Sequence, residues 1–139
     1  MNRLLLSTSL LAAFTAVIHI FVGTPEIEGP LLQSTLPQEV SLLLYACWHL
    51  VSVTLTLSAV AFFISARTID TSSHYMTKLL SCMWLCFGLV FIAVALLYSD
   101  FSMLIKLPQW TLLLPVGALG LWGSSSKGFK SLRSPTTVS

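Results

Sequence analysis

The sequence predicts an all-α protein, a four-helix transmembrane bundle with both termini in the cytoplasm. Three observations support this prediction. Hydrophobic residues make up 55% of the 139 residues and charged residues only 9%, against about 25% charged in a typical soluble domain. Four apolar stretches approach the roughly 20 residues that cross a bilayer as a helix. Six of the seven Lys and Arg residues fall on one predicted side, the side that the positive-inside rule assigns to the cytoplasm.

The predicted helices cover approximately residues 4–22, 36–66, 76–98 and 107–123, so that residues 1–123 form one transmembrane domain. A signal peptide is an alternative for the first stretch, because Asn2 and Arg3 precede it. Its length of about 19 residues exceeds the usual apolar core of 7–15, and no Ala-x-Ala site follows. We therefore expect a retained helix. Residues 124–139, rich in Ser and basic side chains, are expected to form a flexible basic cytoplasmic tail.

The first connection contains strong helix-breaking signals and an unusual charge pattern. Gly23, Thr24 and Pro25 are expected to end the first helix, since glycine adds flexibility and proline removes a backbone donor. The connection then carries Glu26, Glu28 and Glu39 with no basic residue. The sequence therefore predicts an acidic loop on the outer side of the membrane.

Polar side chains recur on one side of each of the first two predicted helices. Tyr45 and His49 share a side of the second helix at about 100° per residue, and Thr15 and His19 do so on the first. Lipid cannot satisfy such groups, so both stripes are expected to face the interior of the bundle. The two stripes lead to a hypothesis that His19 and His49 form one site.

Besides contact with a ligand or a place in a proton pathway, roles that ionisable groups within a membrane often have, three roles for the histidines are compatible with the sequence. Two imidazoles are usual axial ligands of haem b. A transition metal is the second alternative, held by His19, His49 and a carboxylate of Glu26, Glu28 or Glu39, although no HxxxH or CxxC spacing supports it. In the third, each imidazole, with one donor and one acceptor, only ties neighbouring helices together.

The fourth predicted helix contains the stretch PQWTLLLPVGALGLWG. Trp110 and Trp122 have the spacing of aromatic anchors at the two membrane interfaces. Gly117, Gly120 and Gly123 give the helix a smooth face that lets another backbone approach closely. We expect these three glycines to be helix-packing residues.

Three segments together resemble a family of small four-helix bacterial inner-membrane proteins of unknown function. They are HIFVGTPEIEGPLL, WHLVSVT and LPQWTLLLPVGALGLWG. The resemblance covers nearly the whole chain and implies a location in the bacterial inner membrane, but it implies no activity. The positions that match the landmarks of the family are His19, Pro25, Glu26, Pro30, Trp48 and His49.

These observations favour a small binding or accessory protein over an enzyme. Its ligand-binding candidates form an outward-facing polar pocket: His19, Glu26, Glu28, Glu39, Tyr45, Trp48 and His49. The alternatives are a haem- or metal-binding redox protein, an enzyme acting on lipid or quinone through Glu26 and His19, and an oligomeric transporter. Expected partners are the lipid bilayer and either a second copy or a larger membrane complex. The basic residues form no patch of the kind that binds nucleic acid.

Overall fold

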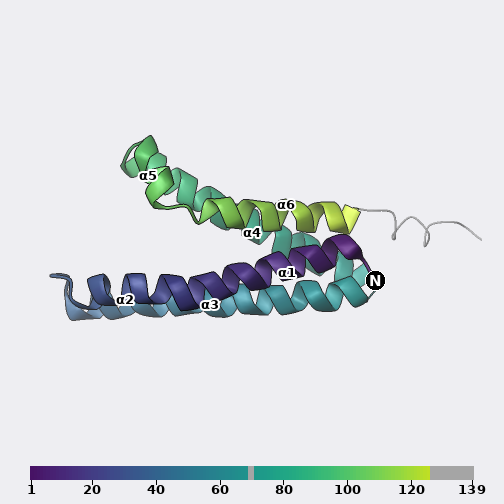
Figure 1. Cartoon of the computed structure of the whole chain (residues 1–139), viewed down its shortest axis with the longest axis horizontal. Coiled ribbons are helices and arrows are strands. Elements are labelled where there is room, and N and C mark those ends of the chain that lie inside the picture. The colour runs from purple at the N-terminus through teal and green to yellow at the C-terminus, as the bar shows by residue number, and fades with distance from the viewer. Residues whose placement is uncertain (69–70, 126–139) are drawn as a thin grey trace, which may run out of the picture.

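The computed structural model describes residues 1–68 and 71–125, which form helices joined by short connections. The elements are α1 (Arg3–Ile18), the π-helical turn η1 (His19–Gly23), α2 (Thr24–Leu32), α3 (Gln38–Arg67), α4 (Thr71–Tyr98), α5 (Phe101–Lys106) and α6 (Trp110–Ser125) (Figure 1). The prediction of an all-α protein is confirmed. Most of the predicted tail lies outside the described residues.

The first predicted helix is longer than expected, because α1, η1 and α2 form one continuous helix over Arg3–Leu32. The prediction that it ends near residue 22 is wrong. Pro25 lies directly after the π turn, in the first turn of α2. The wider hydrogen-bonding pattern of a π turn lets the helix continue past a residue that has no N–H to donate. Glu26 and Glu28 therefore lie on a helix rather than in a loop.

This long helix packs antiparallel against α3, a helix of 30 residues. The Ser9 hydroxyl donates to the Ala59 carbonyl across the contact at 3.0 Å. The buried hydroxyls of Thr8 and Thr15 donate instead to carbonyls one turn back in α1, each at 2.9 Å. These hydroxyl groups can therefore lie in an apolar contact without needing a partner on α3.

The second antiparallel pair consists of α4 and α6, joined through the short helix α5 (Figure 1). α4 begins at Thr71, before the predicted start at residue 76, and α6 begins at Trp110, after the predicted start at 107. α5 was not predicted. The Asp100 side chain caps it by accepting from the Ser102 N–H at 2.9 Å and from the Ser102 hydroxyl at 2.6 Å.

The two helix pairs meet near the start of α1 and the end of α6, and they diverge toward α2 and α5 (Figure 1). Trp84 of α4 and Phe62 of α3 are fully buried where the pairs meet, and the Trp84 indole N–H has no hydrogen-bond partner among the described residues. The buried cluster comprises Ala12, Ala16, Leu55, Ala59, Phe62, Trp84, Leu113 and Val116.

Asn2 forms hydrogen bonds to three helices where the pairs meet. Its side-chain oxygen accepts from the N–H groups of Leu4 and Leu5 and so caps α1. Its side-chain nitrogen donates to the Gly123 carbonyl of α6, and its backbone N–H donates to the Ala66 carbonyl of α3, both at 2.8 Å. One residue thus satisfies groups at the ends of α1, α3 and α6, where helices leave backbone groups unpaired.

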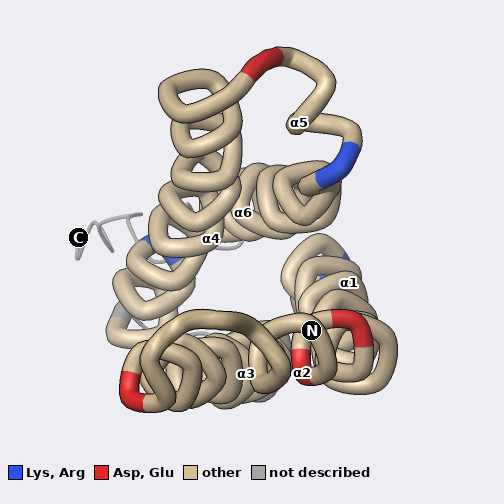
Figure 2. The backbone as a smooth tube through the Cα atoms, turned by 90° about the vertical axis from the view of Figure 1, so that its left-hand side faces the viewer, with Lys and Arg blue, Asp and Glu red and all other residues tan. Residues whose placement is uncertain are grey.

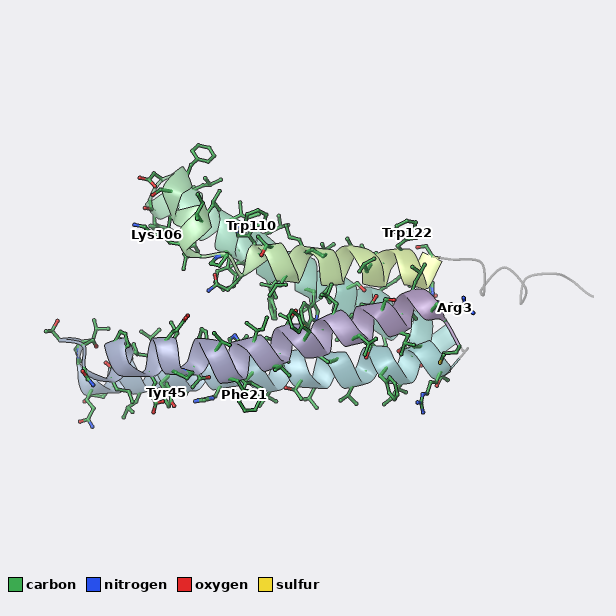
Figure 3. The ribbon with its side chains drawn as sticks, viewed as in Figure 1. Arg3, Phe21, Tyr45, Lys106, Trp110 and Trp122 are labelled. Atoms are coloured by element: carbon green, nitrogen blue, oxygen red, sulfur yellow. The ribbon has the colours of Figure 1, made fainter. Side chains whose placement is uncertain are left out.

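Among the described residues, most of the acidic side chains lie at one end of the long axis and Arg3 and Arg67 at the other. Arg3 and Arg67 lie at the basic end, where α1 begins and α3 ends. The opposite, acidic end carries Glu26, Glu28, Glu39 and Asp100, together with Lys106 (Figure 2). Figure 3 shows Arg3 and Trp122 toward the basic end and Lys106 toward the acidic end.

Among the described residues, three helices are long and apolar enough to cross a membrane: Arg3–Leu32, Gln38–Arg67 and Ser72–Tyr98. The fourth predicted span, α6, has 16 residues, about 24 Å at 1.5 Å per residue. The chain is therefore a small helical protein with three candidate membrane-spanning helices.

Candidate functional site

Trp48 lies at the centre of the contact between α3 and the π turn. The His19 ring stacks on the Trp48 ring with centroids 4.0 Å apart and an angle of 18° between the planes. The Trp48 indole N–H donates to the Thr24 hydroxyl at 3.0 Å. The Trp48 carbonyl lies 3.3 Å from His19 Nε2. Because a carbonyl only accepts, Nε2 carries the proton in this arrangement.

Gly23 makes room for the Trp48 ring. A Cβ atom at this glycine would lie 2.8 Å from Trp48 Cζ2 and 3.2 Å from Cη2, closer than a side chain tolerates. The Thr24 hydroxyl, which accepts from Trp48, donates in turn to the His19 carbonyl at 3.5 Å. The Gly23-Thr24-Pro25 sequence that was expected to break the helix therefore builds a π turn around one indole ring. Such π turns are frequent at functional sites.

A second group of side chains lies on another side of α3. The Tyr45 ring meets the His49 ring edge to face, with centroids 4.5 Å apart and an angle of 85°. The Glu28 carboxylate of α2 lies close to the Tyr45 hydroxyl. His49 is exposed and Tyr45 is half-buried. This second group links α2 to α3 through one acidic and two aromatic side chains.

The structure thus divides the predicted pocket residues into two groups and leaves two of them outside both. His19 and Trp48 belong to the stacked group, whereas Glu28, Tyr45 and His49 form the edge-to-face group. The two imidazoles are within electrostatic range of each other, but each ring packs on a different aromatic partner. The other two candidates, Glu26 and Glu39, are exposed on α2 and in the first turn of α3.

The contacts of His19 limit how haem b or a metal ion could bind. One face of the His19 ring is covered by Trp48, and its Nε2 donates to the Trp48 carbonyl, so Nδ1 is the ring nitrogen left for a metal. The His49 ring packs against Tyr45 instead of Trp48, and no contact within residues 1–68 and 71–125 directs both imidazoles at one point. Among the described residues, no three His, Cys, Asp or Glu side chains converge as metal ligands would.

The three glycines predicted to pack helices lie in contacts of α6. A Cβ at Gly117 would lie 2.8 Å from the Ser81 carbonyl of α4, and one at Gly120 would overlap the Ser81 hydroxyl. A Cβ at Gly123 would lie 2.7 Å from a methyl carbon of Leu5 in α1. α6 therefore approaches both α4 and α1 more closely than alanine at these positions would allow.

A shallow apolar depression lies beside the proline of α6. Its lining residues are Leu85 on α4 and Trp110, Thr111, Leu114, Pro115 and Ala118 around α6. The indole N–H of Trp110 is held by the Leu104 carbonyl at 3.1 Å, and the Thr111 hydroxyl is held by the Pro108 carbonyl at 2.6 Å. The polar groups of these two side chains are therefore satisfied without a ligand.

Sequence reasoning missed two residues that hold the site and the fold together. Thr24 was interpreted only as part of a helix stop, although it bridges Trp48 and His19. Asn2 carried a usable signal, since asparagine directly before an apolar helix is a preferred N-cap. Its contacts with α3 and α6, in contrast, depend on tertiary structure and have no local signal.

Comparison of the chain with known protein families, with curated protein sequences and with solved structures gives no significant match. The resemblance to small inner-membrane proteins remains an expectation from the sequence.

Proposed function

We propose that the chain is a small integral protein of the bacterial inner membrane, with four spanning helices and both termini cytoplasmic. In this proposal it acts as a binding or accessory protein through its acidic end. The observation that carries the proposal is the position of the Trp48 and Tyr45 groups, which lie between α3 and the π turn and α2, toward the end where the helix pairs diverge (Figure 1 and Figure 3). Polar and aromatic side chains placed at such an opening are available to a partner.

The positions of the basic residues support a specific depth in the bilayer. About 20 residues cross the hydrocarbon core. Counted from Leu4, beside Arg3, that length ends at Gly23, and counted from Ala66, beside Arg67, it ends at Cys47. The π turn and Trp48 then lie at the outer membrane interface, where Trp and Tyr concentrate. α2 and the first turns of α3 project beyond it.

The fourth proposed span, α6, is shorter than the other three. α6, at about 24 Å, is shorter than the hydrocarbon core of about 30 Å. Trp122 near its inner end is exposed, as expected of an interface anchor. A helix this short is accommodated by local thinning of the bilayer or by association with other helices.

Labelling of two single-cysteine variants tests the orientation. In a background without Cys47, Cys82 and Cys86, Gln33→Cys and Thr68→Cys place thiols at the C-caps of α2 and α3, and both positions are exposed. We expect a membrane-impermeant maleimide to label only Gln33→Cys in intact cells, and to label both variants after permeabilisation. Labelling of Thr68→Cys alone in intact cells would show the opposite orientation and contradict the proposal.

A further inference from the structure

One face of α3 is covered near the basic end and bare near the acidic end. At 3.6 residues per turn, positions 18 apart lie on the same line along a helix. Val40, Leu44 and Cys47 are thus aligned with Ser58, Phe62 and Ser65, all three of which are buried. Phe62 contacts α6, because a Cβ at Gly120 would lie 3.2 Å from its ring. The same face of α3 is therefore exposed where the helix pairs diverge.

The bare part of this face is an apolar stripe. We call Val40, Leu43, Leu44 and Cys47 the outer stripe; their spacing of three and four residues places them side by side. Val40 is 40% exposed, Leu43 64% and Leu44 46%. The proposed function places Cys47 at the membrane interface and the three larger residues outside it. Tilt does not bury them, because a helix of about 45 Å exceeds the hydrocarbon core even at 20–30°.

The charge near the outer stripe identifies the kind of surface that covers it. Glu39 lies one turn before Leu43, and α2 adds Glu26 and Glu28. No Lys or Arg occurs between Arg3 and Arg67. A second copy packed through the same face would bring like charges together, which is unfavourable. An anionic membrane surface likewise attracts basic segments and not acidic ones.

We propose that the outer stripe docks an amphipathic helix of another protein, one that carries Lys or Arg beside its apolar face. This inference rests on the membrane placement in the proposed function. The partner helix takes the place along α3 that the second helix pair occupies near the basic end, and its cations meet Glu39 and the glutamates of α2. Helices laid on an apolar stripe are recognised through residues at spacings of three and four.

Site-specific photocrosslinking in cells that make the full chain tests the proposal. A benzoylphenylalanine at Leu43 probes the outer stripe, and the same residue at Leu42, which is 51% exposed on another side of α3, is the matched control. We expect Leu43 to crosslink, at least five-fold more than Leu42, to a segment of another protein with Lys or Arg within two turns. Glu39→Lys should reduce that yield several-fold.

Four results would overturn the proposal: equal yields at Leu43 and Leu42, crosslinks to a second copy, crosslinks to α5 of the same chain, or crosslinks to lipid alone. A crosslinked segment without basic residues, or one insensitive to Glu39→Lys, would also contradict it. The maleimide experiment reports separately on the proposed function. If Gln33→Cys is labelled only from the cytoplasm, the proposed orientation is wrong, and this conclusion does not depend on what Leu43 crosslinks to.

Discussion

Replacing Gly117 by alanine tests how closely α6 approaches α4. The new Cβ would lie 2.8 Å from the Ser81 carbonyl oxygen and 2.6 Å from Leu85 Cγ. Because a backbone oxygen cannot move aside as a flexible side chain does, the helices must separate. Overpacking of this kind costs about 1–3 kcal/mol. Alanine in place of glycine returns about 0.5–1 kcal/mol through helix propensity.

Gly29→Ala is the matched control for this substitution. Gly29 also lies within a helix, but a Cβ there would meet no atom beyond its own stretch of helix within 4 Å. We expect this variant to change the free energy of unfolding little, because Pro30 disfavours a helical backbone for a preceding residue with a Cβ and so offsets the propensity gain of about 0.5–1 kcal/mol. Gly117→Ala should lose up to about 2.5 kcal/mol. Unfolding in mixed micelles with increasing SDS, followed by circular dichroism at the helix band, measures both. A Gly117→Ala variant as stable as Gly29→Ala would refute the close approach.

Three further predictions concern other parts of the fold. Asn2→Ala should lower the free energy of unfolding by about 1 kcal/mol for the lost cap, and Asn2→Ser, which keeps a capping oxygen but not the amide that donates to Gly123, should lose less; the same SDS titration measures both. Trp48→Phe and Thr24→Val each remove the hydrogen bond between the indole and the hydroxyl, so a double-mutant cycle should show a coupling of about 0.6 kcal/mol, and additive effects would argue against the bond. The Ser102 hydroxyl and N–H hold the pKa of Asp100 below its usual value. A lowered folded-state pKa stabilises α5 at neutral pH, and the effect is lost as the pH falls through that pKa. Ser102→Ala should therefore raise the pKa of Asp100 in an NMR titration, and an unchanged pKa would contradict the contact.

Composition and hydropathy were sufficient to predict the helical class and the three long apolar helices. Both properties depend on the average character of stretches of 20 or more residues, which the sequence shows directly. The predicted end of the first helix was wrong because Gly23 and Pro25 are ambiguous locally. Their effect depends on Trp48, which lies 25 residues after Gly23 in the sequence. The Trp48 ring leaves no room for a side chain at Gly23, and its indole N–H donates to the Thr24 hydroxyl.

The candidate site was predicted as a set of residues and not as an arrangement. Helical periodicity placed His19 and His49 on polar stripes and put Tyr45 on the same side as His49. The structure pairs His49 with Tyr45, four residues earlier on α3, and His19 with Trp48. The second pairing had no local signal, because it follows from the register between α1 and α3, which long-range contacts such as the one between Ser9 and Ala59 fix.

The depth of α3 in the bilayer is the central claim, and spin labels along its exposed positions measure it directly. Leu43→Cys, Leu50→Cys and Leu57→Cys replace exposed leucines that are 64%, 65% and 63% accessible, in a background without native cysteines. We predict that the label at position 43 collides mainly with a water-soluble nickel reagent, while those at 50 and 57 collide mainly with oxygen dissolved in the bilayer. A label at position 43 as deep as that at 50 would contradict the account.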